Sequence, residues 1–179
     1  MFKHFLPDRE IEHYCELTPE ALSELGVRLL ITDVDNTLVP YDNERPTEEV
    51  KRWIESFKKA GIDVAILSNN GIKRVELFNR DLGLFAVHKS GKPKRSAVGR
   101  ITEHFGVKPE ETAFLGDQLF TDVLCGRRAG AYTVLTDSIS EREGVFVKLK
   151  RVLEIPIRRK LGLRPPKIRK KKDKKGDER

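Results

Sequence analysis

The stretch Leu29–Leu38, LLITDVDNTL, decides the fold of this 179-residue chain. Three apolar residues run almost directly into two aspartates, Asp33 and Asp35, which lie two positions apart. A short apolar run bounded by polar residues is the pattern of a buried β-strand. Two carboxylates at the end of such a strand are costly to hold near a core without a compensating cation. The stretch therefore predicts a central strand whose end binds a cation, or a charged ligand together with one.

Similar short apolar runs recur along the chain and alternate with helical patterns. The strand-like runs are 27–32, 62–67, 84–87, 113–115 and 131–135. The helical patterns begin at Thr18 and Thr47 and then cover 73–82, 93–105, 120–129 and 143–153, with a break at Pro156. This alternation is typical of a parallel α/β sheet flanked by helices. We therefore expect one three-layer, Rossmann-like domain over residues 1–163, with its strand ends meeting at one edge of the sheet.

The composition is that of a single domain with an ordinary core, since 38% of the residues are hydrophobic. No apolar run approaches the roughly 20 residues of a membrane-spanning helix. The N-terminus lacks the pattern of a signal peptide. Cys15 and Cys125 form neither a CxxC pair nor a ligand cluster. The chain is therefore expected to be a cytoplasmic protein with reduced thiols, without a disulfide framework or a zinc site.

Polar side chains follow the predicted strands in the same way that Asp33 and Asp35 follow the first. Ser68 and Asn69 end the second strong strand, Lys92 precedes a helix, and Asp117 and Asp122 follow a third strand. A parallel sheet brings these groups to one edge. Magnesium prefers oxygen ligands, and phosphoryl transfer needs both charge neutralisation and fixed donors. The set of residue types therefore indicates metal-assisted phosphoryl chemistry.

These residues resemble the motifs of a known family. Asp33-Val34-Asp35-Asn36-Thr37 is similar to the DxDxT motif of the haloacid dehalogenase (HAD) superfamily of phosphohydrolases. Ser68, Lys92 and the pair Asp117 and Asp122 resemble the second, third and fourth motifs, in order. The longer segments around these motifs resemble the YqeG-type branch of subclass IIIA. These segments are FLPD, TPE, TDVDNTLV, LSNN, GKP and GDQLFTDV. The resemblance covers about residues 5–161, and the branch has eukaryotic relatives that include a mitochondrial phosphatidylglycerophosphate phosphatase.

The resemblance implies a magnesium-dependent phosphomonoester hydrolase that uses an aspartyl-phosphate intermediate. Asp33 would be the nucleophile and a magnesium ligand. Asp35 would be the general acid and base, and its backbone carbonyl would bind the metal. Asp117 would bind magnesium directly. Asp122 would bind it through water or would hold Lys92.

The resemblance also implies which residues bind the phosphoryl group. Ser68 would hydrogen-bond a phosphoryl oxygen, and Lys92 would neutralise its charge; both are catalytic candidates. Asn69 is a further candidate for substrate binding, although Asn70 is open to the same role. Taken alone, each of these groups has an ordinary structural explanation, such as a turn or a helix start. The agreement of four motifs in order favours the functional interpretation.

The spacing of the motifs leaves no room for an inserted cap domain. One loop and one helix fill the gap between Asp33 and Ser68, and the next gap, to Lys92, is shorter. We therefore expect an open site whose specificity comes from loop 39–46, from a partner or from a large substrate surface. An open site favours a macromolecular, membrane-bound or otherwise bulky substrate. The family resemblance and the basic end of the chain together suggest a lipid headgroup such as phosphatidylglycerophosphate, and a phosphorylated nucleic acid or protein is the second option.

Positive charge is concentrated at the end of the chain. From Arg158 onward there are twelve Lys and Arg residues against three acids, whereas the whole chain has a net charge of +7. Residues 164–179 are expected to be a disordered basic tail. The tail has three open interpretations: docking on an anionic membrane, binding of RNA or a ribosome as a non-enzymatic binding module, and simple solubilisation.

The helical pattern before the tail combines apolar and basic residues. Phe146, Leu149, Val152 and Leu153 repeat at helical spacing among lysines and arginines. Packing of this apolar side on the sheet is the favoured interpretation, and attachment to a membrane surface, peripheral to the cytoplasm, is the alternative.

Overall fold

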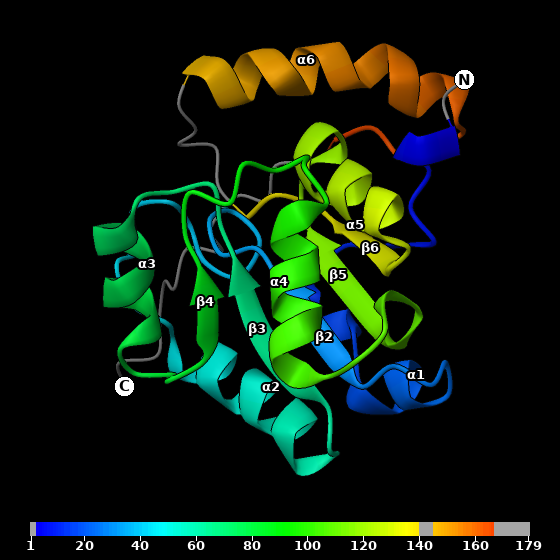
Figure 1. The fold of residues 1–179 in the computed structure, drawn as a ribbon. Helices are drawn as coiled ribbons and strands as arrows, with labels where there is room; N and C mark the ends of the chain where they lie inside the picture. Colours follow the sequence, from blue (N-terminus) through cyan, green and yellow to red (C-terminus); the bar gives the residue numbers. More distant parts are fainter. Residues whose placement is uncertain (1–2, 140–144, 167–179) are drawn as a thin grey trace, which may run out of the picture.

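The computed structural model describes residues 3–139 and 145–166, which form a six-stranded sheet (Figure 1). Every neighbouring pair of strands is parallel, and the order across the sheet is β1-β6-β5-β2-β3-β4. The strands are β1 (Arg9–Ile11), β2 (Leu29–Thr32), β3 (Asp63–Leu67), β4 (Phe85–Val87), β5 (Thr112–Gly116) and β6 (Tyr132–Thr136). Strand β2, the apolar part of the opening stretch, is central and lies between β5 and β3.

Helices cover both faces of this sheet. The α-helices are α1 (Pro19–Ser23), α2 (Glu48–Lys59), α3 (Ile72–Asn79), α4 (Ser96–Phe105), α5 (Leu124–Ala129) and α6 (Val145–Lys160). Short helical turns are η1 (Lys3–Phe5), η2 (Tyr14–Glu16), η3 (Pro109–Glu111) and the π-helix η4 (Leu119–Val123). One buried cluster joins α1, α2 and α3 to the sheet, and a second joins α4 and α5 to its other face. The expected three-layer Rossmann-like architecture is therefore confirmed, and the described residues contain no cap domain.

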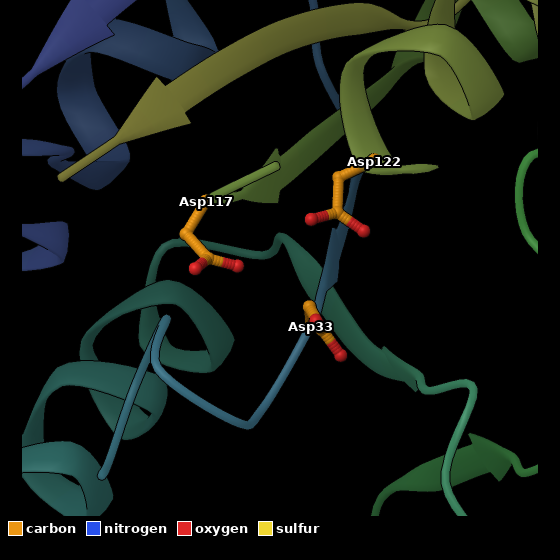
Figure 2. A group of neighbouring side chains, drawn as sticks. All are labelled: Asp33, Asp117 and Asp122. Carbon is orange, nitrogen blue, oxygen red and sulfur yellow. The ribbon is translucent and has the colours of Figure 1, made fainter. Parts of the chain in front are cut away.

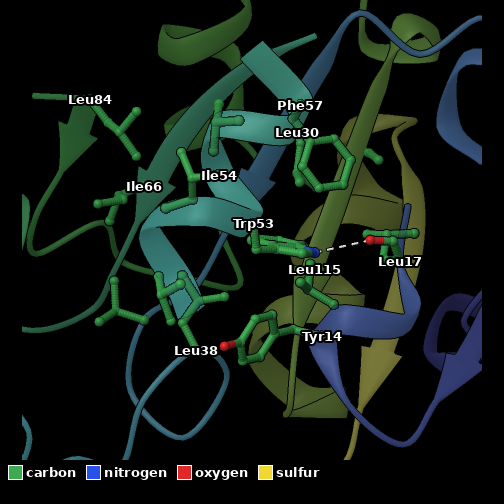
Figure 3. Packing of buried hydrophobic residues seen from close by; sticks show 14 of the residues in the cluster. Tyr14, Leu17, Leu30, Leu38, Trp53, Ile54, Phe57, Ile66, Leu84 and Leu115 are labelled. Atoms are coloured by element: carbon green, nitrogen blue, oxygen red, sulfur yellow. Dashed lines mark hydrogen bonds between the residues drawn. The ribbon is translucent and has the colours of Figure 1, made fainter. Parts of the chain in front are cut away.

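The core explains why β2 reads as a continuous apolar run. Leu30 packs into the cluster under α2, whereas Leu29 and Ile31 pack into the cluster under α4. A strand buried on both faces has no polar face to alternate with. The cluster around Trp53 is shown in Figure 3, where the indole Nε1 donates to the backbone oxygen of Leu17 at 3.0 Å. That bond ties the N-terminal segment to α2.

All five predicted strands exist, but the sixth was missed. Strand β1 pairs in parallel with β6 at one edge of the sheet. Its three residues, two of them charged, carry almost no hydrophobic pattern. Asp8 anchors the segment, because its carboxylate accepts hydrogen bonds from the backbone nitrogen and the hydroxyl of Thr133 at 2.8 and 2.9 Å. Side-chain hydrogen bonds of this kind have no periodic signature in a sequence.

The expectation that the last helix breaks at Pro156 is wrong, because α6 continues through it to Lys160. Proline removes the hydrogen bond that residue 156 would donate to the carbonyl of Val152. Val152 is 60% exposed, so this side of the helix faces water. The helix is held instead from its opposite side, where Glu154 and Arg158 form a buried ion pair at 3.3 Å.

The expectation that α6 packs on the sheet by its apolar side is also wrong for the residues that can be judged. Val152 and Leu153 are exposed, while Arg151, Glu154 and Arg158 are buried. Helices α4 and α5 already cover the sheet face. Helix α6 instead lies across the end of the sheet toward which β3 and β4 point (Figure 1), where polar groups need partners. The side chains of Phe146 and Leu149, and residues 167–179 of the basic tail, lie outside the described part.

Within residues 3–139 and 145–166, no helix combines the length and the apolar character needed to cross a bilayer.

Candidate active site

Three buried carboxylates meet at the carboxyl edge of the sheet. Asp33 directly follows β2, Asp117 directly follows β5, and Asp122 lies in η4. One ligand oxygen from each lies within 4.8 Å of the others. Figure 2 shows the three side chains grouped around one space, although they come from distant parts of the chain. The sheet thus brings together three of the four acids that were predicted to bind metal.

Lys92 joins two of these acids. Its ammonium nitrogen lies 3.1 Å from an Asp33 oxygen and 2.8 Å from an Asp122 oxygen, and its side chain is 2% exposed. The same nitrogen lies 5.7 Å from the centre of the Phe114 ring, within range of a cation–π interaction. Of the two roles left open for Asp122, contact with Lys92 is therefore present in the structure.

Burial dominates the electrostatics of this group. Burial raises the pKa of Asp33 to about 8; Lys92 opposes this shift, and the neighbouring acids Asp122 and Asp117 add to it. Burial alone would lower the pKa of Lys92, but Asp122 and Asp33 outweigh burial and raise it. The site thus holds more negative charge than Lys92 alone neutralises, as expected where a cation is to bind.

A glycine at the end of β5 lets Asp122 approach. A Cβ atom at Gly116 would lie 2.3 Å from the Cβ of Asp122, closer than any real contact. The Asp122 carboxylate also accepts a hydrogen bond from the backbone nitrogen of Gln118 at 3.1 Å. Any side chain at position 116 would therefore push Asp122 out of the group.

Arg151 of α6 is a site residue that sequence reasoning missed. Its guanidinium forms a buried ion pair with the Asp117 carboxylate and also donates to the backbone oxygen of Asp117 at 3.4 Å. On the other carboxylate oxygen, Asp117 accepts from the Thr37 hydroxyl at 3.3 Å. A charged residue at helical spacing most often marks a solvated face, so nothing in the sequence distinguished Arg151.

Glu154 of the same helix holds the segment that carries Asp122. Its carboxylate accepts from the backbone nitrogens of Leu119 and Phe120, at 2.8 and 3.4 Å, and so caps η4 from another helix. Residue Gln118 at the start of η4 makes no side-chain capping bond of its own. Burial raises the pKa of Glu154 to about 7, against the opposing effect of Arg158 and Arg151. Helix α6 therefore fixes both acids of the fourth motif.

Asp35, the fourth residue predicted to bind the metal, was expected to do so through its backbone carbonyl, and its carboxylate makes contacts of a different kind. One of its carboxylate oxygens binds Arg74, at 2.7 Å from Nη2 and 3.0 Å from Nε, and the other accepts from Asn70. Arg74 also donates to the backbone oxygen of Glu44 at 3.1 Å, so it connects loop 39–46 to Asp35. The carboxylate of Asp35 is not part of the acidic group that could hold a metal ion.

Arg74 was also missed, although the sequence carried a signal for it. The residue lies in the first turn of α3. Cations are disfavoured at a helix N-terminus, where the helix dipole is positive. A basic residue there, next to a predicted site, points to an acidic partner such as Asp35.

Ser68 and Asn69 directly follow β3, and Asn69 contacts the backbone of Lys92. The Ser68 hydroxyl is buried and accepts from the backbone nitrogen of Asn70 at 3.1 Å. The side-chain oxygen of Asn69 accepts from the Ser90 hydroxyl at 2.8 Å and from the backbone nitrogen of Lys92 at 2.9 Å. Its amide nitrogen donates to the backbone oxygen of Lys92 at 3.3 Å. Asn69 thus holds the Lys92 loop in place, a role that was not anticipated.

A cavity of about 140 Å³ lies over these groups. Its lining includes Asp33, Asp35, Ser68, Asn69 and Lys92, together with Asn36, Tyr41, Asn70, Gln118 and Thr121. Tyr41 comes from loop 39–46 and is exposed. The side-chain oxygen of Asn36 is buried and accepts no hydrogen bond from the described residues. The cavity therefore combines an ammonium group, carboxylates, a hydroxyl and the side-chain oxygen of Asn36, which can accept a hydrogen bond from a ligand.

The donor set fits a hard divalent cation. Asp33, Asp117 and Asp122 offer only oxygen atoms, which Mg²⁺ prefers. No histidine or cysteine belongs to this group, so it does not suit the nitrogen and sulfur ligands that Zn²⁺ favours.

Comparison with known proteins identifies the family. Residues 8–130 match the model of the haloacid dehalogenase-like hydrolases. The probable phosphatase YqeG of Bacillus subtilis is 40% identical over 152 residues, which are 85% of this chain and 88% of that protein. The chloroplastic and mitochondrial phosphatidylglycerophosphate phosphatase 1 of Arabidopsis thaliana is 27% identical over 173 residues, covering 89% of this chain but 50% of that protein.

Solved structures show the same fold at lower identity. The cobalt-bound deoxy-D-mannose-octulosonate 8-phosphate phosphatase YrbI of Haemophilus influenzae has a TM-score of 0.51 and is 21% identical, with 77% of this chain and 91% of that chain covered. A hypothetical protein of Xanthomonas campestris has a TM-score of 0.53 and is 20% identical, with 73% and 77% covered. These two neighbours support the fold alone.

The family model and the YqeG relative each match most of the chain. Both matches include all three residues of the acidic group. The chain therefore belongs to the haloacid dehalogenase-like hydrolases, as a phosphatase of the YqeG type.

Proposed function

We propose that this phosphatase hydrolyses a phosphomonoester through a phosphorylated Asp33, with Mg²⁺ as its cofactor. The observation that supports this most directly is the buried group of Asp33, Asp117 and Asp122, bridged by Lys92. Asp33, Asp117 and Asp122, with the backbone carbonyl of Asp35, would hold the metal. Bound there, Mg²⁺ would neutralise charge on the phosphoryl oxygens.

In the first step, an Asp33 oxygen attacks phosphorus and the bond from phosphorus to the ester oxygen breaks. Lys92 faces Asp33 and neutralises the phosphoryl group, while the Ser68 hydroxyl donates to one of its oxygens. Asp35 gives a proton to the departing ester oxygen, and an alcohol leaves. Arg74 and Asn70 orient Asp35 for this transfer.

In the second step, Asp35 takes a proton from water, whose oxygen attacks phosphorus. The bond from phosphorus to Asp33 breaks, inorganic phosphate leaves, and both carboxylates return to their starting state. Lys92 again faces the charge that develops on Asp33. Two acids thus divide the work, one as nucleophile and the other as proton carrier.

The proposed substrate is a bulky phosphomonoester, with phosphatidylglycerophosphate as the leading candidate. The cavity of about 140 Å³ has room for a phosphoryl group and is lined by polar side chains. The rest of a large substrate would lie outside, over loop 39–46, since no cap domain occurs among the described residues. We further propose that the enzyme acts in the cytoplasm as domain 1–163, with 164–179 as a basic extension.

Turnover of p-nitrophenyl phosphate by the purified chain tests the activity. We expect release of p-nitrophenol with Mg²⁺ and none with excess chelator. A panel of soluble phosphomonoesters, compared with phosphatidylglycerophosphate in mixed micelles, then tests the substrate class. If none of these phosphomonoesters were hydrolysed in the presence of Mg²⁺, the proposed activity would be overturned.

The raised pKa of Asp33 predicts a pH-dependent affinity for metal. With a pKa of about 8, Asp33 holds a proton at lower pH that the cation must displace. The apparent affinity for Mg²⁺ should therefore rise by up to about tenfold per pH unit below pH 8 and level off above it. Calorimetric titration from about pH 6 to about pH 9 measures this. Asp33→Asn should lose the dependence, and a constant affinity in the wild type would contradict it.

A further inference from the structure

Among the described side chains of helix α6, three charged ones face inward and three large apolar ones face outward, while Ile157 packs partly against the buried cluster of Leu119, Val123 and Leu135. Arg151, Glu154 and Arg158 are 6%, 0% and 2% exposed. Val152, Leu153 and Ile155 are 60%, 55% and 39% exposed, and we call these three side chains the outer face of α6. The inner side chains bind Asp117, Leu119 and one another, so they fix which side of the helix faces out.

This outer face differs from other exposed apolar residues of the described chain. Leu6, Leu25, Tyr41 and Ile72 are also exposed, but they are scattered over four separate elements and loops. Three large apolar side chains within four positions of one helix form a patch instead. A contiguous apolar patch on a soluble protein commonly marks an interaction surface.

The positive charge that follows the outer face in the sequence favours an anionic partner. Between Glu154 and Asp173 the sequence has nine Lys and Arg residues and not one acid, although two of the nine are already paired, Arg158 with Glu154 and Arg164 with Glu12. Arg159 and Lys160 are exposed on the last turn of α6, directly after the outer face. Apolar side chains flanked by positive charge are the composition of a helix that lies in the interface of an anionic membrane.

We infer that α6 docks this protein on an anionic phospholipid bilayer, with Val152, Leu153 and Ile155 entering the boundary between headgroups and acyl chains. The apolar side chains favour a bilayer over RNA. Nucleic-acid phosphates would attract the arginines and lysines but would not bury Val152 or Leu153. An anionic bilayer interacts favourably with both kinds of side chain. It buries the apolar area, and it contributes about 1 kcal/mol for each Lys or Arg near its surface.

Docking through this helix would place the catalytic edge at the membrane. Helix α6 lies across the strand ends (Figure 1), and Arg151 on its inner side contacts Asp117 directly. A lipid headgroup would then need only to reach the cavity beside the docked helix. This last step rests on the proposed phosphatase function, whereas docking itself does not.

Sedimentation of the full chain with vesicles tests the inference. We expect binding to vesicles of phosphatidylcholine mixed with phosphatidylglycerol, and weak binding to phosphatidylcholine alone. The double variant Val152→Ser/Leu153→Ser should bind about tenfold or more weakly, because it loses apolar burial. Arg159→Glu/Lys160→Glu should lose a similar factor and should reduce the salt dependence. The matched control, Leu25→Ser/Ile72→Ser, removes two exposed apolar residues elsewhere and should bind like the wild type.

Turnover of p-nitrophenyl phosphate separates this inference from the proposed function. Each surface variant should keep wild-type turnover of this soluble substrate, because none touches the acidic group. Absent turnover in the wild type would overturn the phosphatase function but leave docking standing. Unchanged vesicle binding by Val152→Ser/Leu153→Ser would overturn docking. So would RNA binding without vesicle binding, or a lipid-free dimer that this variant dissociates, because the outer face would then serve another partner.

Discussion

Asp33→Asn is expected to lower kcat for p-nitrophenyl phosphate by about four orders of magnitude or more, the scale seen when a catalytic nucleophile is removed. The amide is a poor nucleophile, and it also removes a negative charge from the metal-binding group. The fold should survive, because the substitution keeps the shape of the side chain and relieves a buried carboxyl whose pKa burial has raised. Steady-state kinetics and thermal melting, measured on the same sample, check both parts.

Asp63→Asn provides the matched control. Asp63 is an exposed acid at the opposite, amino end of β3, so the same chemical change occurs on the far edge of the sheet. Its kcat and melting temperature should equal those of the wild type. If Asp33→Asn kept wild-type turnover, Asp33 would not be the nucleophile. If it failed to fold, Asp33→Ser, which is smaller and uncharged, would separate the loss of chemistry from the loss of structure.

Arg151→Met is expected to lower the stability of the metal-free protein by about 3–5 kcal/mol, because it removes the guanidinium that forms a buried ion pair with the fully buried carboxylate of Asp117. For a chain of this length, that corresponds to a drop in melting temperature of about 10 °C. Thermal melting followed by circular dichroism measures the change. Arg159→Met, an exposed arginine on the same helix, is the control and should melt within a few degrees of the wild type.

Added Mg²⁺ should restore part of the stability lost in Arg151→Met. A divalent cation bound at Asp117 would supply the positive charge that the guanidinium no longer provides. Removing one positive charge beside the site should also tighten the binding of a cation. The rise in melting temperature on adding Mg²⁺ should therefore be larger for Arg151→Met than for the wild type. Equal rises would indicate that Arg151 and the metal act on Asp117 independently, and an unchanged melting temperature without metal would contradict the stabilising role of the pair.

The central strand and the residues at the strand ends could be predicted because local patterns determine them. Burial on both faces makes the first three residues of β2 apolar, and the parallel sheet brings Asp33, Ser68 and Asp117 to one edge wherever the helices lie. The existence of the acidic group therefore follows from the order of strands and helices, together with the spacing of the motifs.

The contacts of Arg74 and Arg151 could not be predicted in the same way. Both are long, charged side chains whose partners, Asp35 and Asp117, lie 39 and 34 positions away. Their roles depend on where α3 and α6 sit, which is a matter of tertiary packing. Helix α6 is the clearest case: its hydrophobic pattern indicated packing through the apolar side, but polar groups at the end of the sheet bind its charged side. The free energy of satisfying those buried groups decided the orientation.

The position of Trp53 gives this protein an internal spectroscopic probe. It is the only tryptophan in the chain, it is 8% exposed, and its indole is bound to the backbone of Leu17. Fluorescence excited at the indole band therefore originates from one place, where the N-terminal segment meets α2. Because that place belongs to the buried cluster under α2, the emission reports whether this half of the core is intact, without any label. Folding and ligand-induced tightening can then be followed in the unmodified chain, at concentrations far below those that calorimetry requires.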